Sequence, residues 1–120
     1  MTAIVSTLIG DPRFMSGVHE FNAGNYFEAH EIWEELWNDL VGNPKQLCQG
    51  LIQIAAGYHK LAIGTPSGAR KLFERGARTL DSFLPNETPE LRQLVARVMR
   101  DLDQLRGGAV QLDGEPPRLG

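Results

Sequence analysis

The sixteen residues from Asn25 to Leu40, NYFEAHEIWEELWNDL, constrain the fold more than any other stretch of this sequence. They contain two tryptophans, one histidine and four glutamates. At about 100° per residue, a helix would gather the apolar side chains on one broad face and most of the carboxylates on the other. The apolar face would hold Tyr26, Phe27, Ala29, Trp33, Leu36, Trp37 and Leu40. This pattern predicts an amphipathic helix that buries one side against the rest of the chain.

One histidine and one glutamate break this separation of polar from apolar residues. His30 falls in the middle of the apolar arc, and Glu34 lies close to it at i, i+4, where side chains on a helix meet. A buried carboxylate either finds a partner or loses its charge, and His30 is the nearest partner. Two interpretations are open: a structural contact that fixes how the helices dock, or part of a binding site beside Trp33 and Trp37.

The motif H-x3-E-x2-W, formed by His30, Glu34 and Trp37, carries a family resemblance. Together with the segments Tyr26-Phe27-Glu28-Ala29 and Gln49-Gly50-Leu51-Ile52-Gln53, it resembles domain of unknown function 309, a family of bacterial and archaeal proteins. The likeness runs from about Phe21 to Leu80. It implies a small all-helical fold with no established activity, and it suggests that the motif is functional and binds metal.

Turn residues divide the chain into about five helices. Helix starts are indicated at Asp11-Pro12, Asn25, Asn43-Pro44, Thr65-Pro66 and Thr88-Pro89, and helix ends at Gly24, Gly42 and Gly107-Gly108. Asn25 with Glu28 three residues later resembles a capping box. We expect an all-α, single-domain bundle of about five helices, built from antiparallel helical hairpins, over residues 1–107. Residues 108–120 have little apolar surface to bury and are expected to form a flexible C-terminal tail.

The segment from Pro44 to Ile63 has the widest apolar arc and is expected to be the central helix. Gln49 and Gln53 share a narrow polar strip on it. Facing the preceding helix, their amides would donate to Glu34 or hold a ligand; facing solvent, they would be ordinary surface residues. The family resemblance favours the former. The predicted ligand pocket is therefore His30, Glu34, Trp37, Trp33, Gln49 and Gln53.

A glycine and a repeat-like spacing add detail about how these helices pack. Gly76 lies inside the apolar arc of the segment that follows Pro66, which indicates close approach of a neighbouring helix. The spacing of Gly24, Tyr26, Ala29 and Trp33 also resembles tetratricopeptide-type hairpins. Only two hairpins fit, which is fewer than such arrays need, so the spacing predicts antiparallel helix pairs.

The His30–Glu34 pair suggests two kinds of chemistry. As metal ligands, His30 and Glu34 would need at least a third donor, for which His59, His19 and water are candidates, and mixed nitrogen and oxygen ligands suit zinc, manganese or iron(II). As a proton-transfer couple they would support acid–base catalysis. No nucleophile, phosphate loop or dinucleotide fingerprint stands beside them, so the sequence leaves open whether the protein is an enzyme.

The net charge and the cysteine content indicate which classes of partner and which cellular compartment to expect. A net charge of −3 gives no general attraction for nucleic acid or for an anionic membrane, and no run of residues reaches membrane-spanning length. Cys48 is the only cysteine, so an intramolecular disulfide is excluded, and a buried thiol in a cytoplasmic protein is expected. The basic residues Arg70, Lys71, Arg75 and Arg78 form either a solvated helix face beside an acidic neighbour or an anion-binding strip.

These observations predict a small helical protein whose polar pocket binds a divalent metal ion or a small ligand. The alternative is a helical protein-interaction module in which the His-Glu-Trp motif is structural. The sequence indicates neither a natural ligand nor a partner protein nor an oligomeric state.

Overall fold

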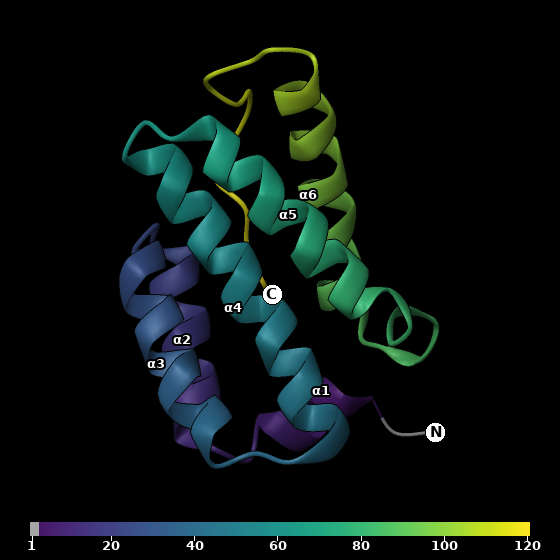
Figure 1. The fold of residues 1–120 in the computed structure, drawn as a ribbon. Coiled ribbons are helices and arrows are strands. Elements are labelled where there is room, and N and C mark those ends of the chain that lie inside the picture. Colours follow the sequence, from purple (N-terminus) through teal and green to yellow (C-terminus); the bar gives the residue numbers. More distant parts are fainter. Residues whose placement is uncertain (1–2) are drawn as a thin grey trace.

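The computed structural model describes residues 3–120, and this part of the chain contains six α-helices, one short 3-10 helix and no β-strand (Figure 1). The elements are α1 (Ile4–Leu8), α2 (Pro12–Asn22), α3 (Tyr26–Asn38), α4 (Gly42–Ala62), α5 (Pro66–Asp81), η1 (Leu84–Asn86) and α6 (Pro89–Arg106). No helix among these residues is both long enough and apolar enough to cross a membrane. The predicted all-α architecture is confirmed.

The longest helix, α4, stands at the centre of the bundle. It packs against α3 on one side and α5 on the other, and α1 also contacts it. Figure 1 shows α2 and α3 beyond one side of α4, with α5 and α6 beyond the other, and consecutive long helices run in opposite directions. The predicted central helix and the predicted antiparallel hairpins are therefore both present.

Two of the five predicted helix starts have side-chain caps, and the other three, at the starts of α3, α4 and α5, do not. Asp11 accepts a hydrogen bond from the Arg13 amide at 2.9 Å, and Thr88 Oγ1 accepts from the Leu91 amide at 3.3 Å. The capping box predicted at Asn25 is wrong. The backbone there has φ −90° and ψ 69°, outside the extended region usual for a cap, and the Asn25 side chain donates instead to Glu20 Oε2 at 2.8 Å.

Helix α1 was not expected from the sequence, because five residues are too few to show a helical period. Its first amides depend on a distant residue: Glu87 Oε1 accepts from the Ile4 amide at 2.6 Å and from the Val5 amide at 3.3 Å. Glu87 is itself buried, next to the start of α6. This helix is therefore capped by tertiary structure, across more than eighty residues of sequence.

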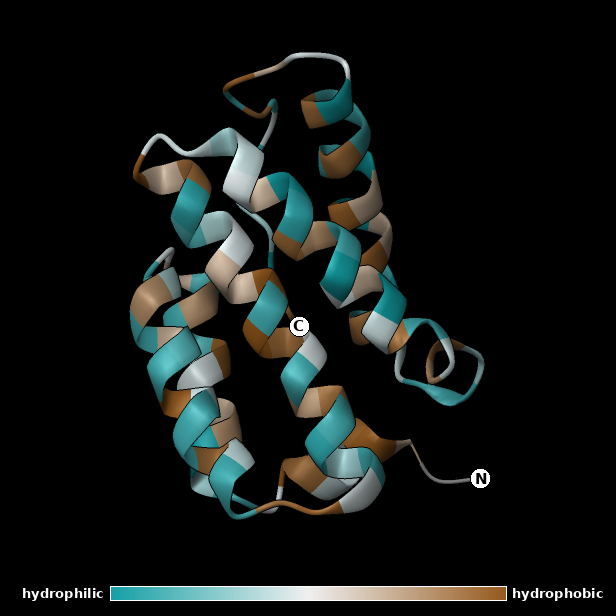
Figure 2. Cartoon of the chain, in the orientation of Figure 1, coloured by the Kyte–Doolittle hydropathy of each residue, from teal (hydrophilic) through white to brown (hydrophobic). Residues whose placement is uncertain are grey.

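The core is continuous, and all of the long helices contribute to it. Hydrophilic and hydrophobic residues alternate along each helix in the way expected for amphipathic helices (Figure 2). The largest fully buried side chains are Phe14, Phe21, Trp33, Leu36, Leu47, Leu51, Ile54, Phe73, Leu80, Leu91, Leu94 and Leu102. Burial of such side chains contributes about 1.5–3 kcal/mol each.

Helices α4 and α5 approach each other most closely where they carry glycine. A Cβ added to Gly50 would lie 2.6 Å from Leu80 Cγ, and one added to Gly57 would lie 2.6 Å from a carbon of the Phe73 ring. A Cβ on Gly76 would meet Ile54 at 2.9 Å. The close helix approach predicted at Gly76 is thus present.

The C-terminal tail lies against the helical body. Asn22 on α2 exchanges two hydrogen bonds with the Leu119 backbone, at 2.7 and 3.3 Å, and the Leu119 side chain is 5% exposed. Arg100 on α6 donates to the Asp113 carbonyl oxygen at 2.6 Å. In Figure 1 the tail turns over the end of α6 and passes behind α5 and α4. Flexibility of residues 108–120 stays a prediction, whereas their position on α2 and α6 is a finding.

We expect Gly50→Ala to destabilise the protein by about 1–3 kcal/mol, although alanine favours helix, because the added methyl overpacks the buried Leu80 side chain. Gly68→Ala in α5 is the matched control: its Cβ would meet side-chain atoms at no less than 3.4 Å. Chemical denaturation of both variants measures the difference. Equal stability of the two would show that the α4–α5 contact relaxes without loss.

Candidate functional site

The H-x3-E-x2-W motif lies on α3, and its neighbour Trp33 points into the core. The Trp33 side chain is fully buried, and its Nε1 donates to the Phe14 carbonyl oxygen on α2 at 3.1 Å. The rings of Phe14 and Phe21 lie 6.4 and 5.9 Å from it, centroid to centroid. Gly17 on α2 gives the indole its space, since a Cβ there would lie 2.1 Å from Nε1. Trp33 therefore holds α2 and α3 together and lines no open pocket.

His30 and Glu34 face each other at the edge of the α3 surface. His30 Nε2 lies 3.4 Å from Glu34 Oε1, and the two side chains are 25% and 54% exposed. The Phe27 ring stacks on the imidazole, with 6.3 Å between centroids and 19° between planes. His30 Nδ1 is buried and is the one such side-chain polar atom in residues 3–120 that lacks a hydrogen-bond partner. The imidazole is thus held in place while the carboxylate remains in water.

Trp37 stands one turn beyond Glu34 and is half-buried. The Lys45 ammonium, in the first turns of α4, lies 4.0 Å from the centroid of its ring. A cation at this distance over an indole contributes about 0.5–1 kcal/mol at an exposed site. Trp37 therefore links the end of α3 to the start of α4.

The two glutamines of the predicted pocket do not join the His30–Glu34 pair. Gln53 Oε1 accepts a hydrogen bond from Thr79 Oγ1 at 3.0 Å, so this side chain contacts α5 rather than α3. Gln49 is half-buried, and no hydrogen bond between these described residues connects either amide to Glu34. The residues predicted as one pocket are therefore divided between the core, the α3 surface and the α4–α5 interface.

The predicted third metal ligand, His59, lies beside Phe27 at the end of α4. Its ring centroid is 5.3 Å from that of Phe27, whose other contact is with His30. Among residues 3–120, no group of three or more His, Cys, Asp or Glu side chains is placed to hold a metal ion. His30 Nε2 and Glu34 Oε1, 3.4 Å apart, have a separation that suits two ligands of one ion. Two donors about 2.1 Å from one ion at a tetrahedral angle lie about 3.4 Å apart.

Cys48 has the structural role expected from the sequence. Its Sγ is fully buried and donates to the Trp33 carbonyl oxygen at 3.4 Å. Burial raises the pKa of the thiol to about 12. Because only the thiolate is an effective nucleophile, this cysteine is inert at neutral pH.

A second polar cluster, the Asp101 cluster, was not identified from the sequence. Asp101 on α6 is fully buried and accepts from Tyr58 Oη at 2.6 Å, from Arg97 Nε at 3.0 and 3.1 Å, and from Arg100 Nη2 at 2.8 Å. Burial, together with the adjacent carboxylate, raises the pKa of Tyr58. The i, i+4 spacing of Arg97 and Asp101 was a usable signal, but it is equally typical of a solvated helix face.

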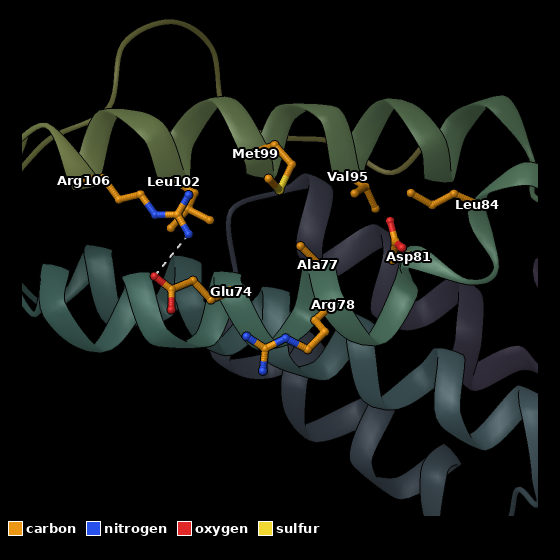
Figure 3. A pocket seen from close by; sticks show the side chains of 9 residues that line it. All are labelled: Glu74, Ala77, Arg78, Asp81, Leu84, Val95, Met99, Leu102 and Arg106. Carbon is orange, nitrogen blue, oxygen red and sulfur yellow. Dashed lines mark hydrogen bonds and ion pairs between the residues drawn. The ribbon is translucent and has the colours of Figure 1, made fainter.

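A groove of about 400 Å³ runs between α5 and α6 (Figure 3). Glu74 reaches across it to Arg106 at 3.4 Å, and Arg78 and Asp81 lie on the same α5 side. Its charged lining residues are therefore two acids and two bases. Arg70, Lys71 and Arg75 of the predicted basic strip are exposed along α5. The groove itself has no excess of either charge.

We expect Asp101→Ala to cost about 3–5 kcal/mol of unfolding free energy, because it leaves the partners of a buried ion pair uncompensated. Asp103→Ala, two residues along the same helix with a side chain 76% exposed, is the control and should change stability by less than about 0.5 kcal/mol. Urea denaturation followed by tryptophan fluorescence measures both. A small effect of Asp101→Ala would mean that water replaces the carboxylate.

Comparison with known proteins gives a family and one relative. The family described as "Domain of unknown function (DUF309)" matches residues 14–72, which include the whole of α2, α3 and α4 apart from the first two residues of α2. An uncharacterized protein of Aquifex aeolicus (strain VF5) is 26% identical over 106 residues, covering 84% of this chain. The chain spans only 29% of that protein's length. No solved structure matches the chain. On these matches, and with the H-x3-E-x2-W motif inside the matched range, the chain belongs to the DUF309 family.

Proposed function

We propose that this protein binds a divalent metal ion through His30 Nε2 and Glu34 Oε1 on the exposed edge of α3. The observation that carries the proposal is the separation of two donors: His30 Nε2 lies 3.4 Å from Glu34 Oε1, and the Glu34 side chain is more than half exposed. The other ring nitrogen, Nδ1, is buried and has no hydrogen-bond partner among the described residues, so Nε2 is the nitrogen that can reach an ion.

The exposure of the pair argues against a purely structural role. Helix α3 docks through Ala29, Trp33 and Leu36, which are each at most 1% exposed. Glu34 is more than half exposed, so it contributes little to that docking. A surface pair of this kind is worth about 0–1 kcal/mol. The ion pair itself therefore contributes little to the stability of the fold, which leaves Glu34 available for binding.

The donor set suits a particular class of ion. One imidazole nitrogen and one carboxylate oxygen, 3.4 Å apart, would occupy two positions of a tetrahedral shell. Zinc, manganese and iron(II) accept such mixed ligands. The other positions would be open to water or to a donor group from a bound molecule. A metal held this way would polarise a bound oxygen as a Lewis acid.

The test is thermal unfolding with a divalent-metal panel and a chelator control, on wild type, His30→Ala and Glu34→Gln. Excess zinc, manganese or iron(II) should stabilise wild type by about 2–3 kcal/mol at a hundredfold excess over Kd, and neither variant should respond. Glu90→Gln, an exposed glutamate on α6, is the matched control and should respond as wild type does, and His19→Ala tests one of the two histidines predicted as a third ligand. His59→Ala separately tests the predicted third ligand. An equal response in wild type and His30→Ala would refute the proposal.

The alternative is a helical interaction module, and one observation favours it. Phe27 and Ile63 are 46% and 57% exposed, and a hollow of about 410 Å³ at this end of α3 and α4 is lined by Phe27, His59 and Ala62. Under this alternative His30 is structural. His30→Ala would then lose about 1–3 kcal/mol whether or not metal is present, which separates the two functions in the same experiment.

A further inference from the structure

A second hollow, of about 290 Å³, lies between the end of α4 and the C-terminal tail. From the helical body it is lined by Tyr26, Tyr58, Leu61, Ala62 and Arg97, and from the tail by residues between 110 and 117. None of the residues of the proposed metal site lines it. Its size is at the lower limit for small-molecule sites, so an occupant would be about one ring with one charged group.

Arg97 enters this hollow with most of its hydrogen-bonding capacity unused. Its Nε donates to both Asp101 carboxylate oxygens, and its side chain is 21% exposed. A guanidinium carries five N–H donors, of which the remaining four are on the two Nη atoms. Among the described residues, no acceptor is bonded to either Nη atom of Arg97. The buried carboxylate thus fixes the guanidinium and leaves its outer edge free.

The charge balance of the Asp101 cluster leaves one positive charge in excess. Two guanidiniums, Arg97 and Arg100, share the single carboxylate of Asp101. Arg100 is 44% exposed and also donates to the tail at Asp113, so the guanidinium that lines the hollow is Arg97. The one acid in the lining, Glu115, is exposed and forms no ion pair with Arg97 among the described residues.

Tyr26 supplies a neutral donor on the same hollow. Burial raises the pKa of its hydroxyl above the ordinary value, so the hydroxyl stays protonated at neutral pH. Its ring lies 5.4 Å from that of Tyr58, centroid to centroid. The Tyr58 hydroxyl is already committed to Asp101. The helical body thus offers the hollow a cation and a hydroxyl, beside the tyrosine rings and the apolar side chains of Leu61 and Ala62.

The tail closes the hollow as a wall anchored at both ends. At one end the Asp113 carbonyl accepts from Arg100, and at the other the Leu119 backbone is bonded to Asn22. Pro116 and Pro117 lie between these anchors and stiffen the segment. The wall is thus held on α6 at one end and on α2 at the other.

We propose that this hollow binds a small organic oxyanion, a carboxylate or a phosphate monoester attached to an aromatic or apolar group. The anion accepts hydrogen bonds from the Arg97 Nη atoms and the Tyr26 hydroxyl, while the apolar group lies against the tyrosine rings, Leu61 and Ala62. Bidentate recognition of this kind is the usual role of a fixed guanidinium.

The test is an NMR titration of the full chain with phenyl phosphate and with benzoate, in the presence of a chelator so that the metal site plays no part. We expect saturable shifts at the Arg97 side chain and at tail amides between 110 and 117, with Kd below about 1 mM for at least one probe. Benzyl alcohol, which has the ring without the charge, should bind at least about tenfold more weakly.

Variants distinguish binding at Arg97 and Tyr26 from a general attraction of anions to the protein's positive charges. Arg97→Lys keeps a cation beside Asp101 but loses the planar donor pair, and should weaken binding at least about tenfold. Tyr26→Phe leaves the Asp101 cluster intact and should weaken anion binding several-fold. This variant tests the site even when the Arg97 variant folds poorly. Glu115→Gln should strengthen binding. Arg92→Lys, an exposed arginine on the same helix, is the control and should change nothing.

Three results would overturn the proposal. The first is the absence of saturable shifts up to about 10 mM of either anion, which corresponds to negligible affinity. The second is equal binding of benzyl alcohol. The third is anion-dependent shifts centred on Arg70, Lys71 and Arg75, unchanged by Tyr26→Phe, which would assign the binding to the exposed strip on α5.

Discussion

The packing of α4 against its neighbours is the constraint on which the rest of the structure depends. On one side, Gly50 and Gly57 bring its backbone within a methyl group of the α5 side chains. On the other, α4 covers the inner face of α3, and its buried Cys48 bonds to the carbonyl oxygen of Trp33. The His30–Glu34 pair lies on α3 at an edge that stays partly exposed, and Tyr58 near the end of α4 donates to Asp101 on α6.

Two groups of polar side chains differ in how fully their buried polar atoms are hydrogen-bonded. Asp101 is fully buried, and every acceptor position it offers is directed at Tyr58 or at an arginine. Removing one partner of a buried ion pair is costly because the other is left uncompensated. His30 instead keeps a buried nitrogen unpaired next to an exposed carboxylate. Asp101 is thus fully paired within the fold, whereas the imidazole of His30 keeps one polar atom unpaired.

The two proposed sites differ in their relation to the family. The range matched by DUF309, residues 14–72, contains His30 and Glu34 but ends before Arg97 and the tail. The anion site therefore combines Tyr26 and Tyr58 from the matched range with elements that lie outside it. Both donors of the proposed metal site, His30 and Glu34, are on α3 and lie inside the matched range.

The sequence by itself determined the local features of this protein: five long amphipathic helices, their approximate ends, the i, i+4 contact of His30 with Glu34, and an inert Cys48. These depend on interactions within a few residues, which periodicity and turn residues encode. Tertiary structure alone decided that Glu87 caps the first helix, that Gln53 faces α5, and that the tail lies on the body. Periodicity identifies the buried face of a helix but not the neighbour that covers it, because that neighbour lies tens of residues away along the chain.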